Sequence, residues 1–233
     1  MSATEAVPLV HGERPAAGEA EGLLVLHHGR GADEHDLLGL ADVLDPRRRL
    51  HVVTPGGPLR LPSWPGRHWY AVPRVGYPDP ATFATAYRSL AAFHDELWRR
   101  TGIGPERTVL GGFSMGSVMS YALGLGRFRD DPRRPTVAGV LAMSGFVPTV
   151  EGFALDPEGR TGAGGTRVLI AHGRHDGVIG HHFAETARAE LTAVGIDVTS
   201  LDGEGDHHVD PTHVLPIAGW LDDVLPLREG ASG

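Results

Sequence analysis

Residues 108–117 read Thr-Val-Leu-Gly-Gly-Phe-Ser-Met-Gly-Ser, an apolar run that ends in a serine between glycines. The stretch from Gly112 to Gly116 matches the pattern G-x-S-x-G. This pattern is typical of a sharp turn from a strand into a helix, where glycines allow close backbone packing and the serine hydroxyl is exposed. The apolar residues before the motif and the helical spacing after it, at 115–128, supply that strand and that helix. We therefore predict that Ser114 is a nucleophile, rather than a serine that only caps a helix.

The rest of the chain alternates short apolar runs with longer amphipathic stretches, which is the pattern of βαβ units. Because the apolar runs are almost continuous, we expect mostly parallel strands that are covered on both faces. The strands are expected at 23–27, 50–54, 108–112, 137–143, 167–172 and 197–201, with an edge strand at 7–11. The helices are expected at 36–44, 82–100, 115–128, 183–194 and 211–225. Together with the serine motif, this order predicts an α/β-hydrolase fold, with a mostly parallel central sheet and helices on both faces.

The domain organisation is expected to be simple. We expect one α/β-hydrolase domain at 23–228, after an N-terminal extension or edge strand at 1–22 and before a flexible tail at 229–233. Two stretches rich in proline and glycine, 55–80 and 144–165, are expected to be loops. Neither stretch is long enough to form a second domain, so no separate lid domain is expected.

Composition narrows the classes of function. With 21 basic and 29 acidic residues the net charge is −8, which argues against a nucleic-acid partner. The chain has no cysteine, so disulfides and cysteine-based metal or redox chemistry are excluded. No basic and apolar leader and no apolar run of about 20 residues is visible, so we predict a cytoplasmic protein without stable membrane insertion.

A serine hydroxyl needs an imidazole to accept its proton and a carboxylate to orient that imidazole. In the α/β-hydrolase order, the acid and then the histidine follow the serine along the chain. We expect the acid at Asp176, directly after an apolar run, with Asp202 and Asp206 as alternatives. The base is expected in the loop before the last helix, which offers His207 and His208.

A second glycine turn, His28-Gly29-Arg30-Gly31, follows the first strong strand. Such an H-G-x-G turn can direct a backbone N–H toward the oxyanion that develops on an attacked carbonyl, and the residue after the nucleophile supplies a second N–H. We expect these two donors to be the backbone amides of Arg30 and Met115. The alternative is an ordinary glycine turn between a strand and a helix.

The fourteen histidines raise the question of a metal site. The pairs at 27–28, 181–182 and 207–208 are adjacent, so their side chains diverge in an extended segment. No H-E-x-x-H, which would place two ligands on one helical face, is present. We therefore predict no metal and no cofactor.

These motifs resemble the phospholipase/carboxylesterase family, which includes acyl-protein thioesterases and small bacterial carboxylesterases. The resemblance covers about 23–225 and rests on Leu-His-His-Gly-Arg-Gly, Gly-Gly-Phe-Ser-Met-Gly, Met-Ser-Gly, His-Gly-Arg-His-Asp and His-His-Val-Asp-Pro. It implies a lidless, metal-independent hydrolase that cleaves small-molecule acyl esters or thioesters through an acyl-enzyme. Dimers occur in families of this kind, so the resemblance leaves a homodimer open.

The resemblance also bears on individual residues. In the family the catalytic histidine is followed by a polar residue, an aliphatic one and then often Ser-Pro or Asp-Pro, and aligning Val209 and Pro211 to that pattern selects His207 as the base. The residue before it is Asp206, where the family usually has glycine. The aromatic segment 63–77 resembles the family segment beside the acyl pocket, so Trp69 is expected either to contact the substrate or to pack in the core.

Other functions stay open on the sequence alone. A related hydrolase can cleave a different bond, in a lysophospholipid, a lactone or a peptide, although lactonases of this kind usually use a cysteine, which the chain lacks. A non-catalytic binding protein on the same fold is a different class. Such a protein is expected to have lost the serine, the acid, the histidine or the flanking glycines, and all of these are intact.

Overall fold

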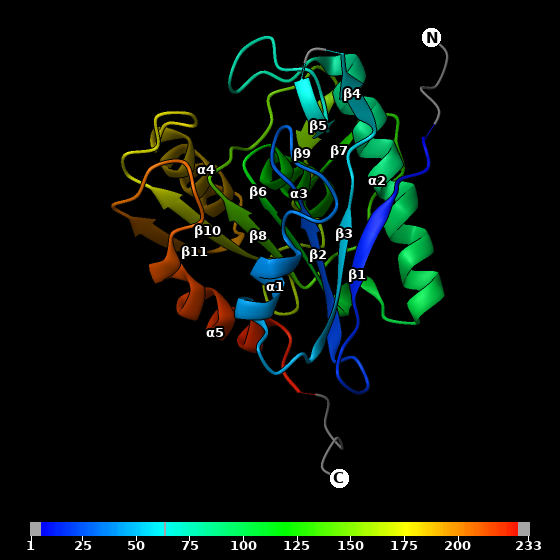
Figure 1. The fold of residues 1–233 in the computed structure, drawn as a ribbon. Helices are drawn as coiled ribbons and strands as arrows, with labels where there is room; N and C mark the ends of the chain where they lie inside the picture. Colours follow the sequence, from blue (N-terminus) through cyan, green and yellow to red (C-terminus); the bar gives the residue numbers. More distant parts are fainter. Residues whose placement is uncertain (1–5, 63, 228–233) are drawn as a thin grey trace.

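A seven-stranded sheet forms the centre of the fold (Figure 1). The computed structural model describes residues 6–62 and 64–227, so the tail predicted at 229–233 lies outside the described residues. The strands follow the order β1-β3-β2-β6-β8-β10-β11, and all neighbours are parallel except β1 and β3. Their bounds are β1 His11–Arg14, β2 Gly22–His27, β3 Leu50–Pro55, β6 Thr108–Phe113, β8 Gly139–Met143, β10 Arg167–Gly173 and β11 Asp197–Gly203. The mostly parallel sheet predicted from the apolar runs is confirmed.

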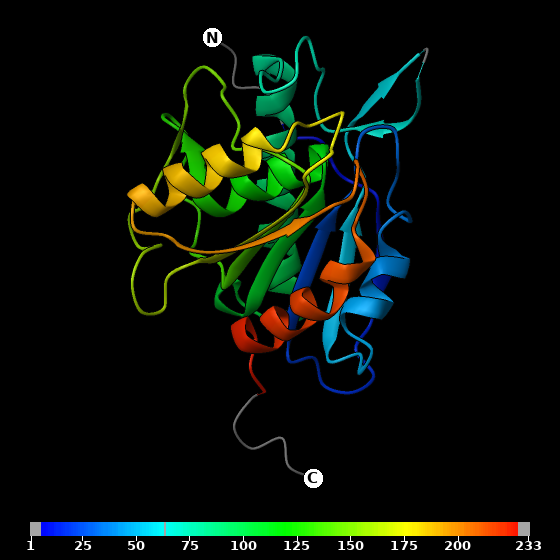
Figure 2. The ribbon, with the colours of Figure 1, turned by 90° about the vertical axis from the view of Figure 1, so that its left-hand side faces the viewer.

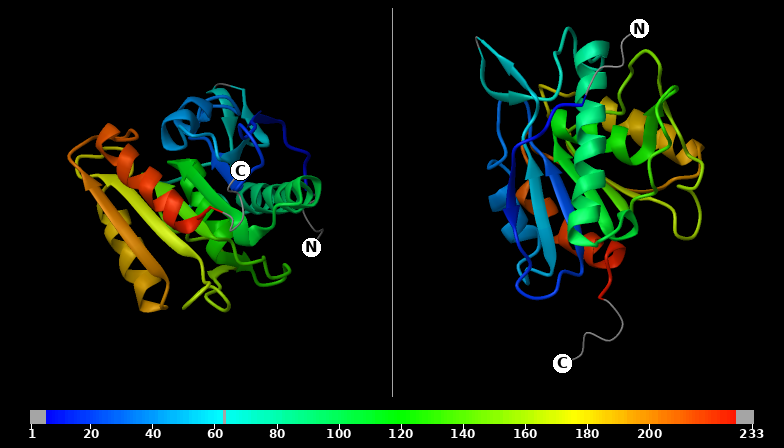
Figure 3. Two further views of the ribbon diagram at one scale, coloured as in Figure 1. Left: turned by 90° about the horizontal axis from the view of Figure 1, so that it is seen from below. Right: turned by 90° about the vertical axis from the view of Figure 1, so that its right-hand side faces the viewer.

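Side chains alternate along each strand, which gives the sheet two apolar faces. In β2, Leu23 and Val25 pack into one core cluster, whereas Leu24 and Leu26 pack into the other. Helices α2, α3 and α4 cover the first face, and α1 and α5 cover the second (Figure 2 and Figure 3). Their bounds are α1 Leu38–Leu44, α2 Pro80–Thr101, α3 Met115–Leu125, α4 His182–Ala193 and α5 Val214–Val224. Helices on both faces, as predicted, are confirmed.

The strands β2 and β6 are neighbours in the middle of the sheet, and the chain leaves them in opposite directions. From β2 it passes through α1 to β3, whereas from β6 it passes through α3 to β8. In open parallel sheets, ligands bind outside the carboxyl ends of the strands at such a reversal of strand order. Ser114 follows β6 directly and therefore lies where this topology places a ligand.

Helix α3 begins in close contact with the end of β2. A Cβ atom at Gly116 would overlap the carbonyl oxygen of His27. A Cβ atom at Gly112 would overlap the backbone of Gly116. Both glycines of the serine turn are thus required by contacts with backbone atoms, which cannot move aside as a flexible side chain can.

The helix predicted at 115–128 is shorter in the structure. Helix α3 ends at Leu125, and the next residues form β7, Gly126–Phe128. This strand pairs with β9, Phe153–Leu155, inside the segment 144–165 that was predicted to be a loop. The prediction is wrong at the C-terminal end of the helix because pairing with a distant strand ends it, and local spacing carries no information on such pairing.

Two further elements differ from the prediction. The segment 55–80, predicted to be a loop, contains an antiparallel hairpin of β4, Leu59–Leu61, and β5, Trp64–His68. The edge strand predicted at 7–11 lies later in the chain, at His11–Arg14. It is antiparallel to its neighbour, so its position depends on register with a strand far away in the sequence.

Two histidines are buried between the sheet and helices α2 and α3. His27 Nδ1 lies 2.8 Å from Ser120 Oγ, and His27 Nε2 lies 3.4 Å from His94 Nε2. Both imidazole rings are fully buried. Burial lowers the pKa of His27 to about 3 and lowers the pKa of His94 well below its usual value. Both side chains are therefore neutral in the folded protein at neutral pH.

We predict that the protein loses stability as the pH falls below about 6.5. The unfolded chain then binds a proton at His27, whereas the folded chain does not until the pH approaches about 3. The stabilisation from neutral His27 is complete above pH 6.5, and about 2 kcal/mol of it is lost by pH 5. Urea unfolding between pH 7.5 and pH 5 measures this loss.

The control for this prediction is a histidine on the surface. His27→Asn should reduce the pH dependence of the free energy of unfolding by about 2 kcal/mol between pH 7.5 and pH 5, because one of the buried imidazoles that resist protonation is removed. His175→Asn removes an exposed imidazole and should leave that dependence unchanged. A wild-type free energy of unfolding that is constant between pH 7.5 and pH 5 would contradict the prediction.

Replacing Gly116 by alanine should destabilise the protein by more than about 3 kcal/mol, because the new Cβ overlaps the His27 carbonyl. Gly219 in α5 has no atom within 4 Å of its Cβ position. Gly219→Ala should therefore be neutral or stabilise by up to about 1 kcal/mol. Thermal and urea unfolding of both variants measure the contrast, and equal effects would show that the contact at His27 has room for a methyl group.

Candidate active site

Ser114 lies at the turn between β6 and α3. Its backbone has φ 54° and ψ −119°, a region that residues other than glycine rarely adopt. Its N–H donates a hydrogen bond to the carbonyl oxygen of Met143 in β8, 2.8 Å away. Holding such a conformation costs roughly 1–3 kcal/mol, and positions of this kind cluster at functional sites.

The serine, histidine and aspartate singled out in the sequence come together beyond the carboxyl ends of the strands. His207 Nε2 lies 2.9 Å from Ser114 Oγ, and His207 Nδ1 lies 2.7 Å from Asp176 Oδ2. When Nδ1–H donates to the carboxylate, Nε2 is free to accept the proton of the serine hydroxyl. The ring of Phe113 packs against the imidazole with 4.9 Å between centroids, which limits its rotation.

The loop after β10 holds Asp176. Its side chain is buried, and Oδ1 accepts hydrogen bonds from the N–H groups of Val178 at 2.9 Å and Ile179 at 2.8 Å. His172 is buried beside it, with Nε2 2.7 Å from the carbonyl oxygen of Ile179 and 3.4 Å from Asp176 Oδ2. Burial lowers the pKa of His172, so this ring is neutral and donates from Nε2 to the loop. These contacts leave Asp176 Oδ2 directed at His207.

Asp206 joins the loop of the acid to the loop of the base. Its Oδ1 accepts hydrogen bonds from the N–H of Gly177 at 3.1 Å and from the N–H of His207 at 2.7 Å. These two bonds lower the pKa of Asp206, so the carboxylate is charged at neutral pH. The sequence suggested Asp206 only as an alternative acid, because nothing local shows that Gly177 lies next to it.

The alternatives raised for the acid and the base lie elsewhere. His208 is exposed, and its ring packs beside Gly205 rather than at Ser114. Asp202 forms ion pairs with His181 at 2.9 Å and with Arg174 at 3.3 Å. The hydrogen-bond geometry therefore favours the residues first selected from the sequence.

The turn expected to supply an oxyanion donor lies beside the serine turn. A Cβ atom added to Gly29 would lie 3.2 Å from the nearest ring carbon of Phe113, so the turn packs against that ring. The hairpin holds this turn through two backbone bonds, from Gly31 N to Arg67 O at 3.0 Å and from Arg67 N to Ala32 O at 2.8 Å. The amide of Arg30 lies within this turn.

Met115 is the first residue of α3, and the first N–H groups of a helix have no acceptor within it. The macrodipole of the helix adds a partial positive charge at this end. The amide of Met115 therefore has no acceptor within the helix and directly follows Ser114 in the chain.

His28 supports the same turn and was missed as a functional residue. Its Nδ1 lies 2.7 Å from the carbonyl oxygen of Gly29, and its Nε2 accepts a hydrogen bond from the N–H of Gly57 at 2.9 Å. Burial lowers the pKa of His28, so the ring is neutral with its proton on Nδ1. The histidine in the H-G-x-G motif was the available signal, but its partner at Gly57 is distant in sequence.

Trp69 was expected to contact the substrate or to pack in the core. Its side chain is 0% exposed, and its indole N–H donates to the carbonyl oxygen of His28 at 2.9 Å. Its backbone N–H lies 3.3 Å from the sulfur of Met115. In this structure Trp69 packs behind the turn and offers no exposed surface to a substrate.

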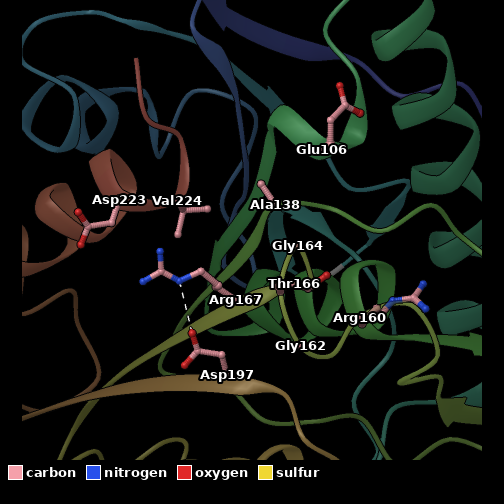
Figure 4. Close-up of a pocket in the computed structure, with 12 residues that line it drawn as sticks. Glu106, Ala138, Arg160, Gly162, Gly164, Thr166, Arg167, Asp197, Asp223 and Val224 are labelled. Atoms are coloured by element: carbon pink, nitrogen blue, oxygen red, sulfur yellow. Dashed lines mark ion pairs between the residues drawn. The ribbon is translucent and has the colours of Figure 1, made fainter. Parts of the chain in front are cut away.

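A cavity of about 360 Å³ lies at the opposite edge of the sheet (Figure 4). Its wall includes Arg167 and Asp197, which begin β10 and β11 and form an ion pair at 3.5 Å. Ser114 follows the carboxyl end of its strand, whereas these residues lie at the amino ends of theirs. The cavity is therefore separate from the site around Ser114.

Two findings limit other interpretations of the described residues. Within 6–62 and 64–227, no helix has the length and apolar character needed to cross a membrane. The same ranges contain no group of three or more histidine, cysteine, aspartate or glutamate side chains that could hold a metal ion. The adjacent histidines 27 and 28 contact different partners, as expected for an extended segment.

Comparison with known sequences points to one family. The family model described as Phospholipase/Carboxylesterase matches residues 14–224. Acyl-protein thioesterase 1 of Gibberella zeae is 25% identical over 250 residues, which cover 97% of this chain and 99% of that protein. Acyl-protein thioesterase 1 homolog 1 of Dictyostelium discoideum is 25% identical over 186 residues, covering 78% of this chain and 76% of that protein.

Solved structures agree with the fold. The crystal structure of esterase PE8 has a TM-score of 0.76 and 30% identity, and covers 94% of this chain and 100% of that one. The Bacillus cereus carboxylesterase has a TM-score of 0.77 and 21% identity, with 93% and 94% covered. The predicted α/β-hydrolase fold is confirmed by these likenesses. Because the family model spans most of its length, the chain belongs to the phospholipase/carboxylesterase family.

Proposed function

We propose that this chain hydrolyses carboxylic esters or thioesters, with Ser114 as nucleophile, His207 as general base and Asp176 as the acid that orients it. The observation that carries the proposal is the chain of two hydrogen bonds, 2.9 Å and 2.7 Å long, that joins these side chains. Membership of a hydrolase family supports it, and so do relatives named esterase, carboxylesterase and acyl-protein thioesterase. The substrate is a small-molecule acyl compound.

In the first step, the Ser114 hydroxyl attacks the acyl carbonyl while His207 Nε2 accepts its proton. The carbonyl oxygen becomes an oxyanion, which the backbone amides of Arg30 and Met115 stabilise. Asp176 stabilises the imidazolium that has formed, and its bonds from the loop keep it in place for this. The imidazolium then protonates the leaving alcohol or thiol as the bond to the acyl carbon breaks.

In the second step, water releases the acyl group from Ser114. His207 accepts a proton from the water as its oxygen attacks the acyl-enzyme carbonyl, and then returns that proton to the serine oxygen as it leaves. The products are a carboxylic acid and the regenerated enzyme. No cofactor takes part in these two reaction steps, because His207 exchanges each proton with Ser114, the substrate or water.

The names of the relatives do not identify which acyl bond this chain cleaves. An experiment has to identify that bond. Several carry the name acyl-protein thioesterase, and one, from Mus musculus, is a lysophospholipase-like protein that is 29% identical over 129 residues, covering 54% of this chain and 51% of that protein. Lysophospholipid, lactone and peptide bonds are the alternatives within the same mechanism. The predicted cytoplasmic location and a homodimer stay predictions of the sequence.

Ser114→Ala and His207→Ala should each lower kcat by about a million-fold, and Asp176→Asn by roughly ten-thousand-fold. Hydrolysis of p-nitrophenyl esters from acetate to palmitate measures this, beside acyl thioesters followed by thiol release. His208→Ala is the matched control for the base and should keep kcat within about threefold, since its ring lies away from Ser114. Full activity in Ser114→Ala would show that the nucleophile is misassigned.

Asp206→Ala should lower kcat by about tenfold with little change in KM, because the loop that carries His207 loses two hydrogen bonds. Asp206→Asn keeps an oxygen that can accept both bonds, so it should restore most of the activity. Glu204→Gln, at an exposed position in the same loop, is the control and should leave kcat unchanged. Equal kcat in wild type and Asp206→Ala would contradict a positioning role.

A further inference from the structure

The side chain of Arg30 is exposed beside the proposed active site. Its guanidinium carbon lies 4.2 Å from the centroid of the Trp64 ring, a cation–π contact with the tip of the hairpin. Among the described residues, no carboxylate lies within the 4.0 Å of an ion pair to this guanidinium. In a chain with a net charge of −8, this leaves a positive charge at the site without an acidic partner.

The nearest acid in the same turn is already paired. Glu34 forms an ion pair with Arg67 at 3.1 Å, and that arginine is mostly buried. Arg30 therefore does not have this acid as a partner, and its backbone lies in the turn beside Phe113. One side-chain length of about 6 Å separates its guanidinium from that turn. Because Gly29 in this turn lies against Phe113, the residue before Ser114, the turn of Arg30 adjoins the turn of the proposed nucleophile.

A second polar side chain in this region lacks a partner. His68 is 0% exposed, and neither of its ring nitrogens has a hydrogen-bond partner in the described part of the chain. It lies on the same face of β5 as Trp64, with 6.3 Å between ring centroids. Buried polar groups are nearly always hydrogen-bonded, so a buried imidazole with two unpartnered nitrogens is uncommon.

We propose that Arg30 and Trp64 form a subsite for an anionic group, with buried His68 beside them, so that the enzyme prefers esters or thioesters that carry a carboxylate near the scissile bond. This inference rests on the proposed hydrolase function. Arginine presents donors in a planar fork that matches a carboxylate, and the contact with Trp64 holds that fork in place before the substrate arrives. His68 is itself buried, so it is a positioning residue that acts on this subsite through the Trp64 ring beside it.

The experiment compares matched charged and neutral esters. One pair carries the charge on the acyl side, mono-p-nitrophenyl adipate and its methyl ester. The other pair carries it on the leaving group, 4-acetoxybenzoate and its methyl ester. The readout is the ratio of kcat/KM for the charged ester to that for the neutral ester, which cancels any effect of a variant on the oxyanion turn.

The wild type should favour the charged ester in at least one pair, and the pair that shows it locates the anionic group. Arg30→Gln should lower that ratio by about tenfold, and Arg30→Lys should retain most of it. His68→Ala should lower it by about threefold, because it removes the ring beside Trp64, whereas His68→Phe keeps a ring there and should retain the ratio. The wild-type preference should also weaken in high salt, because salt screens an exposed charge.

Arg60→Gln is the matched control, since it removes one exposed positive charge from the same hairpin and should leave the ratio unchanged. A wild-type ratio below one in both pairs, or equal losses for charged and neutral esters in Arg30→Gln, would overturn the subsite. If the neutral esters are still hydrolysed in a Ser114-dependent way, the proposed function survives that result. If no ester or thioester is hydrolysed at all, both proposals fall.

Discussion

The close approach of helix α3 to the end of β2 is the constraint on which the rest of the site depends. With no side chain at Gly116, the first turn of the helix lies directly on the carbonyl of His27. The chain can enter the helix from β6 at this distance only through a sharp turn, which puts Ser114 at φ 54°. The strain at one residue is small beside the buried surface that α3 contributes to the core, so the fold as a whole tolerates it.

The parallel register of the sheet explains how residues from separate loops meet. In the pairing of β10 with β11, Gly173 lies opposite Gly203, so the loops after these two strands start side by side. Asp176 comes from the first loop and His207 from the second. A Cβ at Gly173 would overlap the carbonyl oxygen of Gly205, which shows how tightly the two loops pack. Asp206 completes this junction by accepting amide hydrogen bonds from both loops.

Much of this arrangement follows from the sequence because it depends on local patterns. The apolar runs locate the parallel strands to within two residues, since most of these strands are covered on both faces and contain few polar positions. The serine turn carries its own glycines, and the chain order then limits the acid and the base to a few loops. The hydrogen bonds reach Asp176 and His207, the residues that the motifs selected.

The features that the sequence did not reveal all depend on distant partners. The pairing of β7 with β9 joins a segment predicted to be helical with one predicted to be a loop, so the end of α3 at Leu125 has no local mark. The partner of His28 lies at Gly57, and the amide that contacts Asp206 lies at Gly177. Hydrogen bonds between loops depend on the three-dimensional path of the chain. A single sequence, taken by itself, contains no record of that path.

The hairpin β4–β5 contacts both the backbone of the turn that contains Arg30 and the side chain of Arg30. Its Arg67 forms two backbone bonds with the turn that contains Arg30, and Trp69 packs behind the same turn through its bond to His28. The exposed ring of Trp64 in the same hairpin contacts the guanidinium of Arg30. Strand β5 therefore holds the turn through the backbone of Arg67 and the side chain of Arg30 through Trp64. Because the backbone bonds do not depend on side-chain identity, a substitution at Trp64 can change the surroundings of the Arg30 side chain without altering the turn.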